Sequence, residues 1–112
     1  MNLIDWEQLD MIADGFTPDF LDIYREFLEE TPSLFLQLRH QLTSNNAGEA
    51  SKVAHQIKGS AANFGFVGVS QPMAKIEIDA KSGTLLNAAT WLAEAERSFQ
   101  EAALEVKAKR LS

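Results

Sequence analysis

The stretch TPDFLDIYREFLEETPSLFLQLRHQLT, residues 17–43, decides the class of fold. Its apolar side chains recur at spacings of three, four and seven residues, which is the pattern of a helix that buries one face. A capping threonine, a proline at the first helical position and an acid in the first turn mark its start. We expect a helix from Pro18 to about Thr43, which Pro32 should kink or split in two. The expected buried face consists of Phe20, Ile23, Phe27, Leu34, Leu38 and Leu42.

Helical periodicity also marks four further segments of the chain. One of them closes on Phe64 and Gly65, with the glycine in a typical C-terminal position. Another contains Pro72, which is tolerable only near the first turn of a helix. These helices are predicted to cover about 5–13, 47–63, 69–81 and 85–109.

The connections between the predicted helices are short, and no β-hairpin signal, repeat or low-complexity tract interrupts them. Short connections make neighbouring long helices antiparallel. We therefore expect an all-α fold, an up-and-down antiparallel four-helix bundle with a short extra N-terminal helix. A chain of 112 residues fits one domain, so a single domain over residues 1–112 is predicted.

The composition excludes several functional classes. The formal net charge of −6 argues against broad nucleic-acid binding, which depends on clustered Lys and Arg. The absence of cysteine excludes disulfides and thiol chemistry. No apolar run is long enough to span a membrane, and the N-terminus is acidic rather than basic and apolar. We expect a cytoplasmic protein that binds neither nucleic acid nor membrane.

The segment 47–64 carries the chemistry. At about 100° per residue, His55 lies about 160° around the helix from Ile57 and so points away from the core. Lys58 and Gly59 flank His55 one turn later, and Ala62 is nearly in line with it two turns on. The apolar face of this helix should consist of Ala50, Val53, Ala54, Ile57, Ala61 and Phe64.

An imidazole in these surroundings suits reversible phosphoryl transfer. It is nucleophilic near neutral pH, and a nearby ammonium stabilises the negative charge of a phosphoryl group. Lys58 is placed to supply that ammonium. A glycine inside a helix costs roughly 0.5–1 kcal/mol relative to alanine. Close approach by another molecule would justify Gly59.

The stretch AHQIKGSAANFG, residues 54–65, resembles the motif of histidine-containing phosphotransfer (HPt) domains. That motif is a histidine, two residues, Lys-Gly-Ser, small residues and a glycine ten positions after the histidine. Ile76 and Glu77 lie where the family usually has an apolar residue followed by Glu or Gln on the facing helix. The resemblance covers essentially the whole chain. The chain starts at Met1 and has a short tail after Arg110, and in this it is similar to a stand-alone bacterial phosphorelay protein.

The resemblance implies a role for each of four residues. His55 would be the phosphoacceptor, through the ring nitrogen farther from the backbone. Lys58 would contact the phosphoryl oxygens, and Gly59 would leave room for the partner. Glu77 would accept a hydrogen bond from the other ring nitrogen and so fix the tautomer. The family has no kinase activity of its own, so the chain would be a phosphocarrier and not an enzyme.

The implied partners are response-regulator receiver domains and a hybrid sensor histidine kinase. A receiver aspartate would donate the phosphoryl group and a second receiver would take it. Magnesium would belong to the receiver, and this chain would need no cofactor or metal. We expect a monomer that docks through Ile12, Phe16, Ser51, Lys52 and Ala62 around the histidine.

Other interpretations remain open at this point. The main alternative is a non-phosphorylated adaptor or inhibitor bundle that binds a receiver or kinase, although the presence of His55 counts against it. A hydrolytic enzyme lacks a nucleophile–base pair, and two histidines on separate helices do not form a metal site. Lys52 and Glu77 would otherwise be ordinary surface charges, and His40 a solvent-facing residue.

Overall fold

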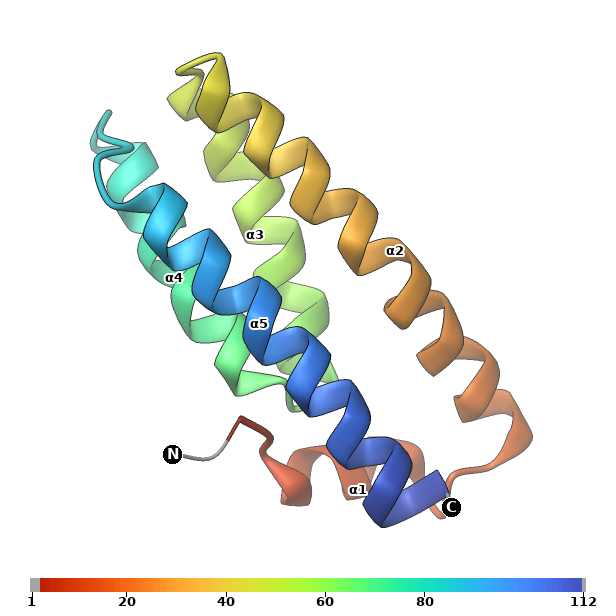
Figure 1. Cartoon of the computed structure of the whole chain (residues 1–112). Coiled ribbons are helices and arrows are strands. Elements are labelled where there is room, and N and C mark those ends of the chain that lie inside the picture. Colours follow the sequence, from red (N-terminus) through yellow and green to blue (C-terminus); the bar gives the residue numbers. More distant parts are fainter. Residues whose placement is uncertain (1–2, 112) are drawn as a thin grey trace.

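The computed structural model describes residues 3–111 of the chain. It contains the α-helices α1 (Trp6–Ala13), α2 (Pro18–Thr43), α3 (Ala47–Asn63), α4 (Val67–Lys81) and α5 (Ala88–Val106). A π-helical turn, η1 (Lys107–Leu111), continues α5 (Figure 1). No strand occurs within residues 3–111.

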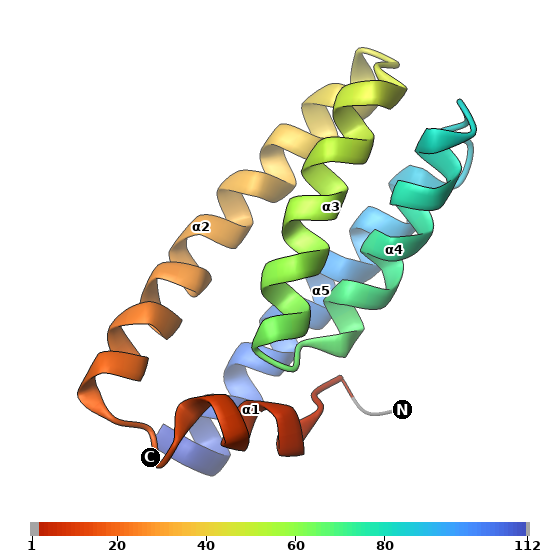
Figure 2. The same cartoon turned by 180° about the vertical axis from the view of Figure 1, so that it is seen from behind.

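Helices α2 to α5 form an up-and-down bundle, and α1 lies across one end of it (Figures 1 and 2). Helix α3 packs most extensively against α4, α4 packs against α5, and α2 contacts both α3 and α5. An ion pair between Arg39 and Glu96 also joins α2 to α5. The predicted all-α bundle with an extra N-terminal helix is confirmed.

Side-chain caps fix the starts of three helices close to the predicted residues. The side-chain oxygens of Asp5, Thr17 and Asn46 accept hydrogen bonds from backbone N–H groups three residues later, at 3.1, 3.2 and 3.1 Å. Helices α4 and α5 lack such a cap. The predicted starts of these two helices were less accurate. Helix α4 begins at Val67 rather than at 69, and α5 begins at Ala88 rather than at 85.

Both helix-interior prolines are accommodated more easily than predicted. Pro32 does not split α2, which continues without interruption from Pro18 to Thr43. Pro32 lies at an exposed position, where the carbonyl that lacks its helical donor is open to solvent. Pro72 lies beyond the first turn of α4 and removes one hydrogen bond, that to the carbonyl of Gly68. The packing of α4 between α3 and α5 compensates for this loss.

The buried face of α2 differs from the predicted one. Ile23 is 55% exposed, and Leu34 and Leu42 are only partly buried. Tyr24 and Phe35 point inward instead. The reason is the aromatic core, in which the rings of Phe27 and Phe64 stack and those of Phe66 and Phe99 meet Phe27 edge-on. The buried residues of α2 are Phe20, Tyr24, Phe27, Thr31, Phe35 and Leu38.

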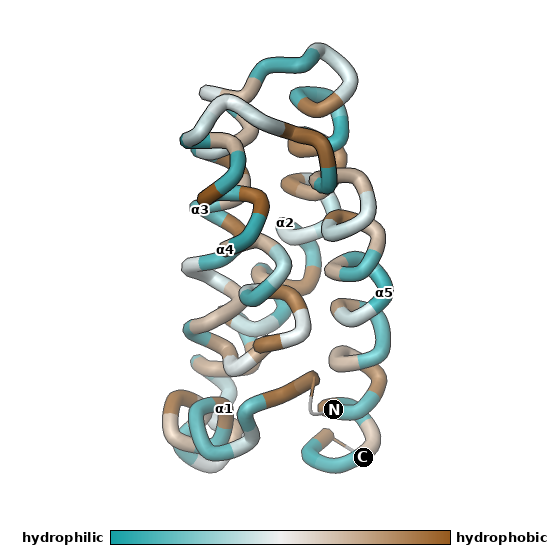
Figure 3. The backbone as a smooth tube through the Cα atoms, turned by 90° about the vertical axis from the view of Figure 1, so that its left-hand side faces the viewer, coloured by the Kyte–Doolittle hydropathy of each residue, from teal (hydrophilic) through white to brown (hydrophobic). Residues whose placement is uncertain are grey.

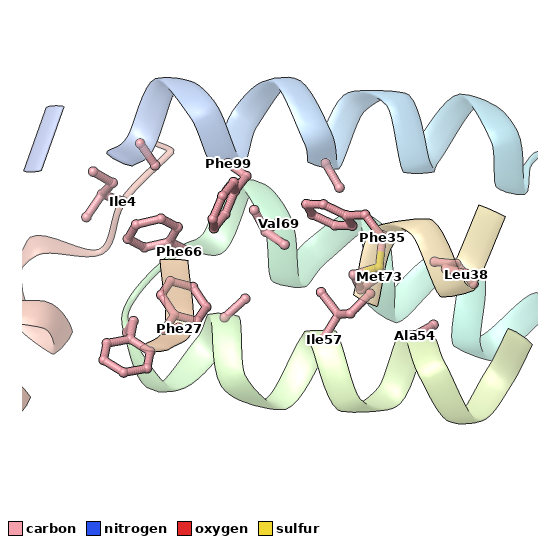
Figure 4. Close-up of a cluster of buried hydrophobic side chains, with 14 of the residues drawn as sticks. Ile4, Phe27, Phe35, Leu38, Ala54, Ile57, Phe66, Val69, Met73 and Phe99 are labelled. Atoms are coloured by element: carbon pink, nitrogen blue, oxygen red, sulfur yellow. The ribbon is translucent and has the colours of Figure 1, made fainter. Parts of the chain in front are cut away.

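The core runs along the length of the bundle between its helices. Figure 4 shows Phe27, Phe66 and Phe99 gathered toward one end, with Ile57, Met73 and Leu38 continuing the cluster toward the other. Apolar and polar residues alternate along each helix of the bundle (Figure 3). Each helix therefore buries one face and exposes the other.

The chain before α1 is held against the loop between α3 and α4. The backbone N–H of Asp5 donates to the carbonyl of Gly65 at 2.7 Å, and the N–H of Gly68 donates to the carbonyl of Leu3 at 3.1 Å. At the other terminus, Arg110 forms two 2.8 Å hydrogen bonds to the carboxylate of Asp10. These contacts fix α1 across the end of the bundle.

Substituting Gly65 by alanine should destabilise the fold strongly. Gly65 has a φ of +75°, and an added Cβ would lie 2.5 Å from the carbonyl oxygen of Asp5. Gly83 has a similar φ of +83° but open space around it. We expect Gly65→Ala to lower the free energy of unfolding by about 2–4 kcal/mol and Gly83→Ala by about 1 kcal/mol. Urea unfolding measures both, and equal losses would show that the contact with Asp5 is unimportant.

Candidate functional site

His55 projects from α3 at the border with α4. The buried side chains of Ala54, Ile57 and Ala61 hold the opposite side of α3 against the core. The side chain of His55 is 67% exposed, as expected for a residue that points away from that face. The predicted apolar face of α3 is thus observed, except that Val53 is only partly buried.

Glu77 of α4 lies beside this ring and is almost fully buried, with a side chain 5% exposed. Its Oε2 is 2.8 Å from Nδ1 of His55. Its Oε1 is 2.6 Å from Nζ of Lys58, and Oε2 is also 3.1 Å from Nζ of Lys81. Glu77 is therefore not an ordinary surface acid, because three donors from two helices converge on its carboxylate.

The cations around Glu77 keep it ionised. The hydrogen bond from Lys58 is the largest influence and lowers the pKa of Glu77 from 4.5 to about 2, with further contributions from Lys81 and His55. Burial raises the same pKa but is outweighed. Near neutral pH the carboxylate only accepts hydrogen bonds. In the neutral form of the imidazole, a hydrogen bond to this carboxylate requires the proton on Nδ1 and leaves the lone pair on Nε2.

The two lysines differ in their surroundings. Lys58, one turn after His55 on α3, is 34% exposed at its side chain. Lys81, one turn after Glu77 on α4, is 66% exposed. Lys81 was not among the predicted site residues. Its spacing of four residues from Glu77 is the signal that would have found it, because residues i and i+4 face each other on a helix.

Small residues surround the ring on the side of α3 that faces solvent. Gly59 is exposed, and a Cβ added to it would meet no atom within 4 Å. Ala62 is exposed as well. The structure thus places His55, Gly59 and Ala62 on one uncrowded surface, where another molecule has room to approach the imidazole.

Ser51 and Lys52 were expected to dock a partner beside His55, but neither presents a free side chain at the site. Ser51 is buried, so it offers little surface and that expectation is corrected. It lies about 60° around the helix from buried Ala54, and its short side chain is covered where the longer imidazole extends outward. Lys52 is exposed and pairs with Glu49 at 3.4 Å rather than with the site.

The two apolar residues expected to dock a partner lie near the end of α1. Ile12 and Phe16 are partly buried and pack against the core. Phe16 meets the ring of Phe20 edge-on at 5.3 Å between centroids. His40, the second histidine, is exposed in the last turn of α2.

A metal-binding cluster and a membrane-spanning helix are both absent from residues 3–111, the part of the chain that the structure describes. No three His, Cys, Asp or Glu side chains come together there in a way that could hold a metal ion. None of the helices in this part is long and apolar enough to cross a membrane.

Replacing Glu77 by glutamine keeps the shape of the side chain and removes its charge. Because the pKa of Glu77 in the fold lies below its usual 4.5, the ionised carboxylate stabilises the protein above about pH 4.5, and this contribution is lost as the pH falls toward 2. We expect Glu77→Gln to lower the free energy of unfolding by about 1–3 kcal/mol at pH 7. The difference from the unsubstituted protein should shrink as the pH is lowered to about 3.

Glu29→Gln is the matched control, because Glu29 is exposed on α2 and forms no ion pair with a described residue. Urea unfolding at several pH values measures both variants. A loss for Glu77→Gln that stays constant from neutral to acid pH would contradict the ionised state of this carboxylate.

A solved structure shares the fold of this chain. The crystal structure of histidine-containing phosphotransfer protein B (HptB) from Pseudomonas aeruginosa PAO1 matches with a TM-score of 0.89, covering 97% of this chain and 95% of that chain. The sequence identity is 21%, so this likeness concerns the fold. No curated protein sequence gives a significant match.

The sequence model of the Hpt domain matches residues 22–108, a range that includes His55 and Glu77. This match supports a phosphotransfer role in a phosphorelay, with the chain as a phosphocarrier rather than an autonomous kinase. Because it covers most of the chain, the protein belongs to the Hpt domain family.

Proposed function

We propose that His55 accepts a phosphoryl group from the aspartate of a response-regulator receiver domain and passes it to another receiver. The observation that carries this proposal is the 2.8 Å contact between Nδ1 of His55 and the buried carboxylate of Glu77. This hydrogen bond orients an exposed ring and leaves the lone pair of Nε2 for attack.

The transfer needs no base to remove a proton. The Nε2 lone pair attacks phosphorus, an N–P bond forms, and the P–O bond to the receiver aspartate breaks to release a carboxylate. The Nδ1 proton stays on the ring, which therefore gains positive charge as the N–P bond forms. The ionised carboxylate of Glu77 lies next to this charge and stabilises it. Transfer to the next receiver is the same step in reverse.

In this proposal, the ammonium group of Lys58 contacts the phosphoryl oxygens and stabilises their negative charge. Its ammonium group is one turn from His55 on the same helix, and it now rests on Oε1 of Glu77 at 2.6 Å. Lysine is a compact charge on a flexible stem. A rotation of the side chain can therefore bring the ammonium toward a phosphoryl group on Nε2, where the negative charge accumulates.

The partners follow from this chemistry. The receiver would bring both the aspartyl phosphate and the magnesium ion, so that the chain needs no cofactor of its own. A hybrid sensor histidine kinase would supply the receiver upstream. We propose that the protein acts as a monomer in the cytoplasm, a compartment compatible with a chain that has no cysteine.

The direct test is labelling by a radiolabelled, phosphorylated receiver. The chain has two histidines, both exposed, which gives a matched pair of variants. We expect acid-labile, alkali-stable label on the unsubstituted protein and on His40→Gln, and none on His55→Gln. Label on His55→Gln would contradict the proposal. The proposal would also be contradicted if none of the receivers tried transferred label to the unsubstituted protein.

A second test separates docking from chemistry at Gly59. The Cβ of a leucine there would meet no atom within 4 Å, so the side chain would start from the open surface beside His55. We expect Gly59→Leu to slow transfer from a receiver by about tenfold or more, a loss of roughly 1.4 kcal/mol in the encounter. Direct labelling by the small donor phosphoramidate should be unchanged.

Ala89→Leu is the control for this experiment, because it adds the same side chain to an exposed position of α5. It should leave both reactions unchanged. If Gly59→Leu and Ala89→Leu gave the same receiver kinetics, the surface around Gly59 would not be where the receiver docks.

A further inference from the structure

One buried carboxylate holds both lysines of the site. Nζ of Lys58 is 2.6 Å from Oε1 of Glu77, and Nζ of Lys81 is 3.1 Å from Oε2. The proposed phosphoryl transfer uses Lys58 and Glu77 but assigns nothing to Lys81. Since a single ammonium would satisfy the charge of one carboxylate, the second lysine calls for an explanation.

The explanation lies in what happens when Lys58 turns to the phosphoryl group. Glu77, whose side chain is 5% exposed with Lys58 in place, then loses the closest of its three partners. An ionised carboxylate is costly to leave unpaired in a buried position. Without a replacement, Glu77 would attract Lys58 back and compete with the phosphoryl oxygens for the same ammonium.

Lys81 is placed to prevent this competition. It contacts Oε2, the oxygen that also accepts from His55, and it approaches from α4 rather than from α3. Its contact with Glu77 does not run through α3, because Lys81 lies one turn after Glu77 on α4 itself. Lys81 can therefore stay on Glu77 while Lys58 moves.

We propose that Lys81 is a positioning residue that stays on Glu77 and neutralises it while Lys58 moves to the phosphoryl group during transfer. This inference rests on the proposed function of His55. In the resting state both ammonium groups share Glu77. In the phosphorylated state Lys58 pairs with the phosphoryl oxygens, and Lys81 remains with Glu77 beside the positively charged ring.

The test is a cycle of substitutions at the two lysines, read by the rate of phosphoryl transfer from a receiver. Because Lys81 acts through Lys58, its effect requires Lys58 to be present. We expect Lys81→Met to slow transfer about fivefold, the size of a partly exposed charge interaction. In the Lys58→Met background the same substitution should change the rate less than twofold.

Two further variants sharpen the result. Lys81→Arg keeps the charge and should restore most of the rate. Lys75→Met removes a lysine from the same helix at an exposed position that makes no ion pair with a described residue, and it should transfer at the unsubstituted rate. Circular dichroism and urea unfolding check that each variant is folded. A merely structural role for Lys81 would slow transfer equally in both Lys58 backgrounds.

The outcomes separate the two proposals. If the unsubstituted protein takes label on His55 but Lys81→Met transfers as fast, or slows equally with and without Lys58, the role of Lys81 is overturned and the phosphocarrier proposal stands. An equal slowing by Lys75→Met would also overturn it, since a general loss of positive charge would then suffice. If the unsubstituted protein takes no label, the phosphocarrier proposal itself fails.

Discussion

The carboxylate of Glu77 joins the two helices that make the site. It reaches from α4 to Nδ1 of His55 and to the ammonium of Lys58, both on α3, and it is buried in the most extensive helix contact of the bundle. Without it, the imidazole would be one exposed ring on a helix surface with no fixed orientation. With it, the same interaction orients the ring, sets its tautomer and links the chemistry to the packing of α3 on α4.

The opposite faces of α3 explain how a small bundle holds such a site rigidly. One face buries Ala54, Ile57 and Ala61, whose small or branched side chains bring α3 close to its neighbours. The other face presents His55 beside Gly59 and Ala62, both of which are exposed. A helix interior glycine costs stability, and the aromatic core of Phe27, Phe64, Phe66 and Phe99 offsets that loss elsewhere in the bundle.

The parts of this description that depend on local geometry could be predicted from the sequence. The placement of His55 away from Ile57, and of Lys58 and Gly59 around it, follows from the pitch of one helix. The burial of Glu77 could not be predicted from one helix, because it depends on how α4 meets α3. The inward face of α2 was misjudged for the same reason: Ile23 and Tyr24 both fit a helical stripe, and the aromatic cluster decides between them. The burial of Ser51 and the continuity of α2 through Pro32 likewise depend on the surroundings of these residues, which the sequence of one helix does not show.

The low pKa of Glu77 has a consequence for how the site responds to its environment. A carboxylate with a pKa of about 2 carries its full charge throughout the neutral range. The negative charge beside the imidazole therefore stays constant over this range. A chain with a net charge of −6 thus gathers two lysines around the carboxylate that contacts its histidine, at the place where the proposed transfer would bring a phosphoryl group.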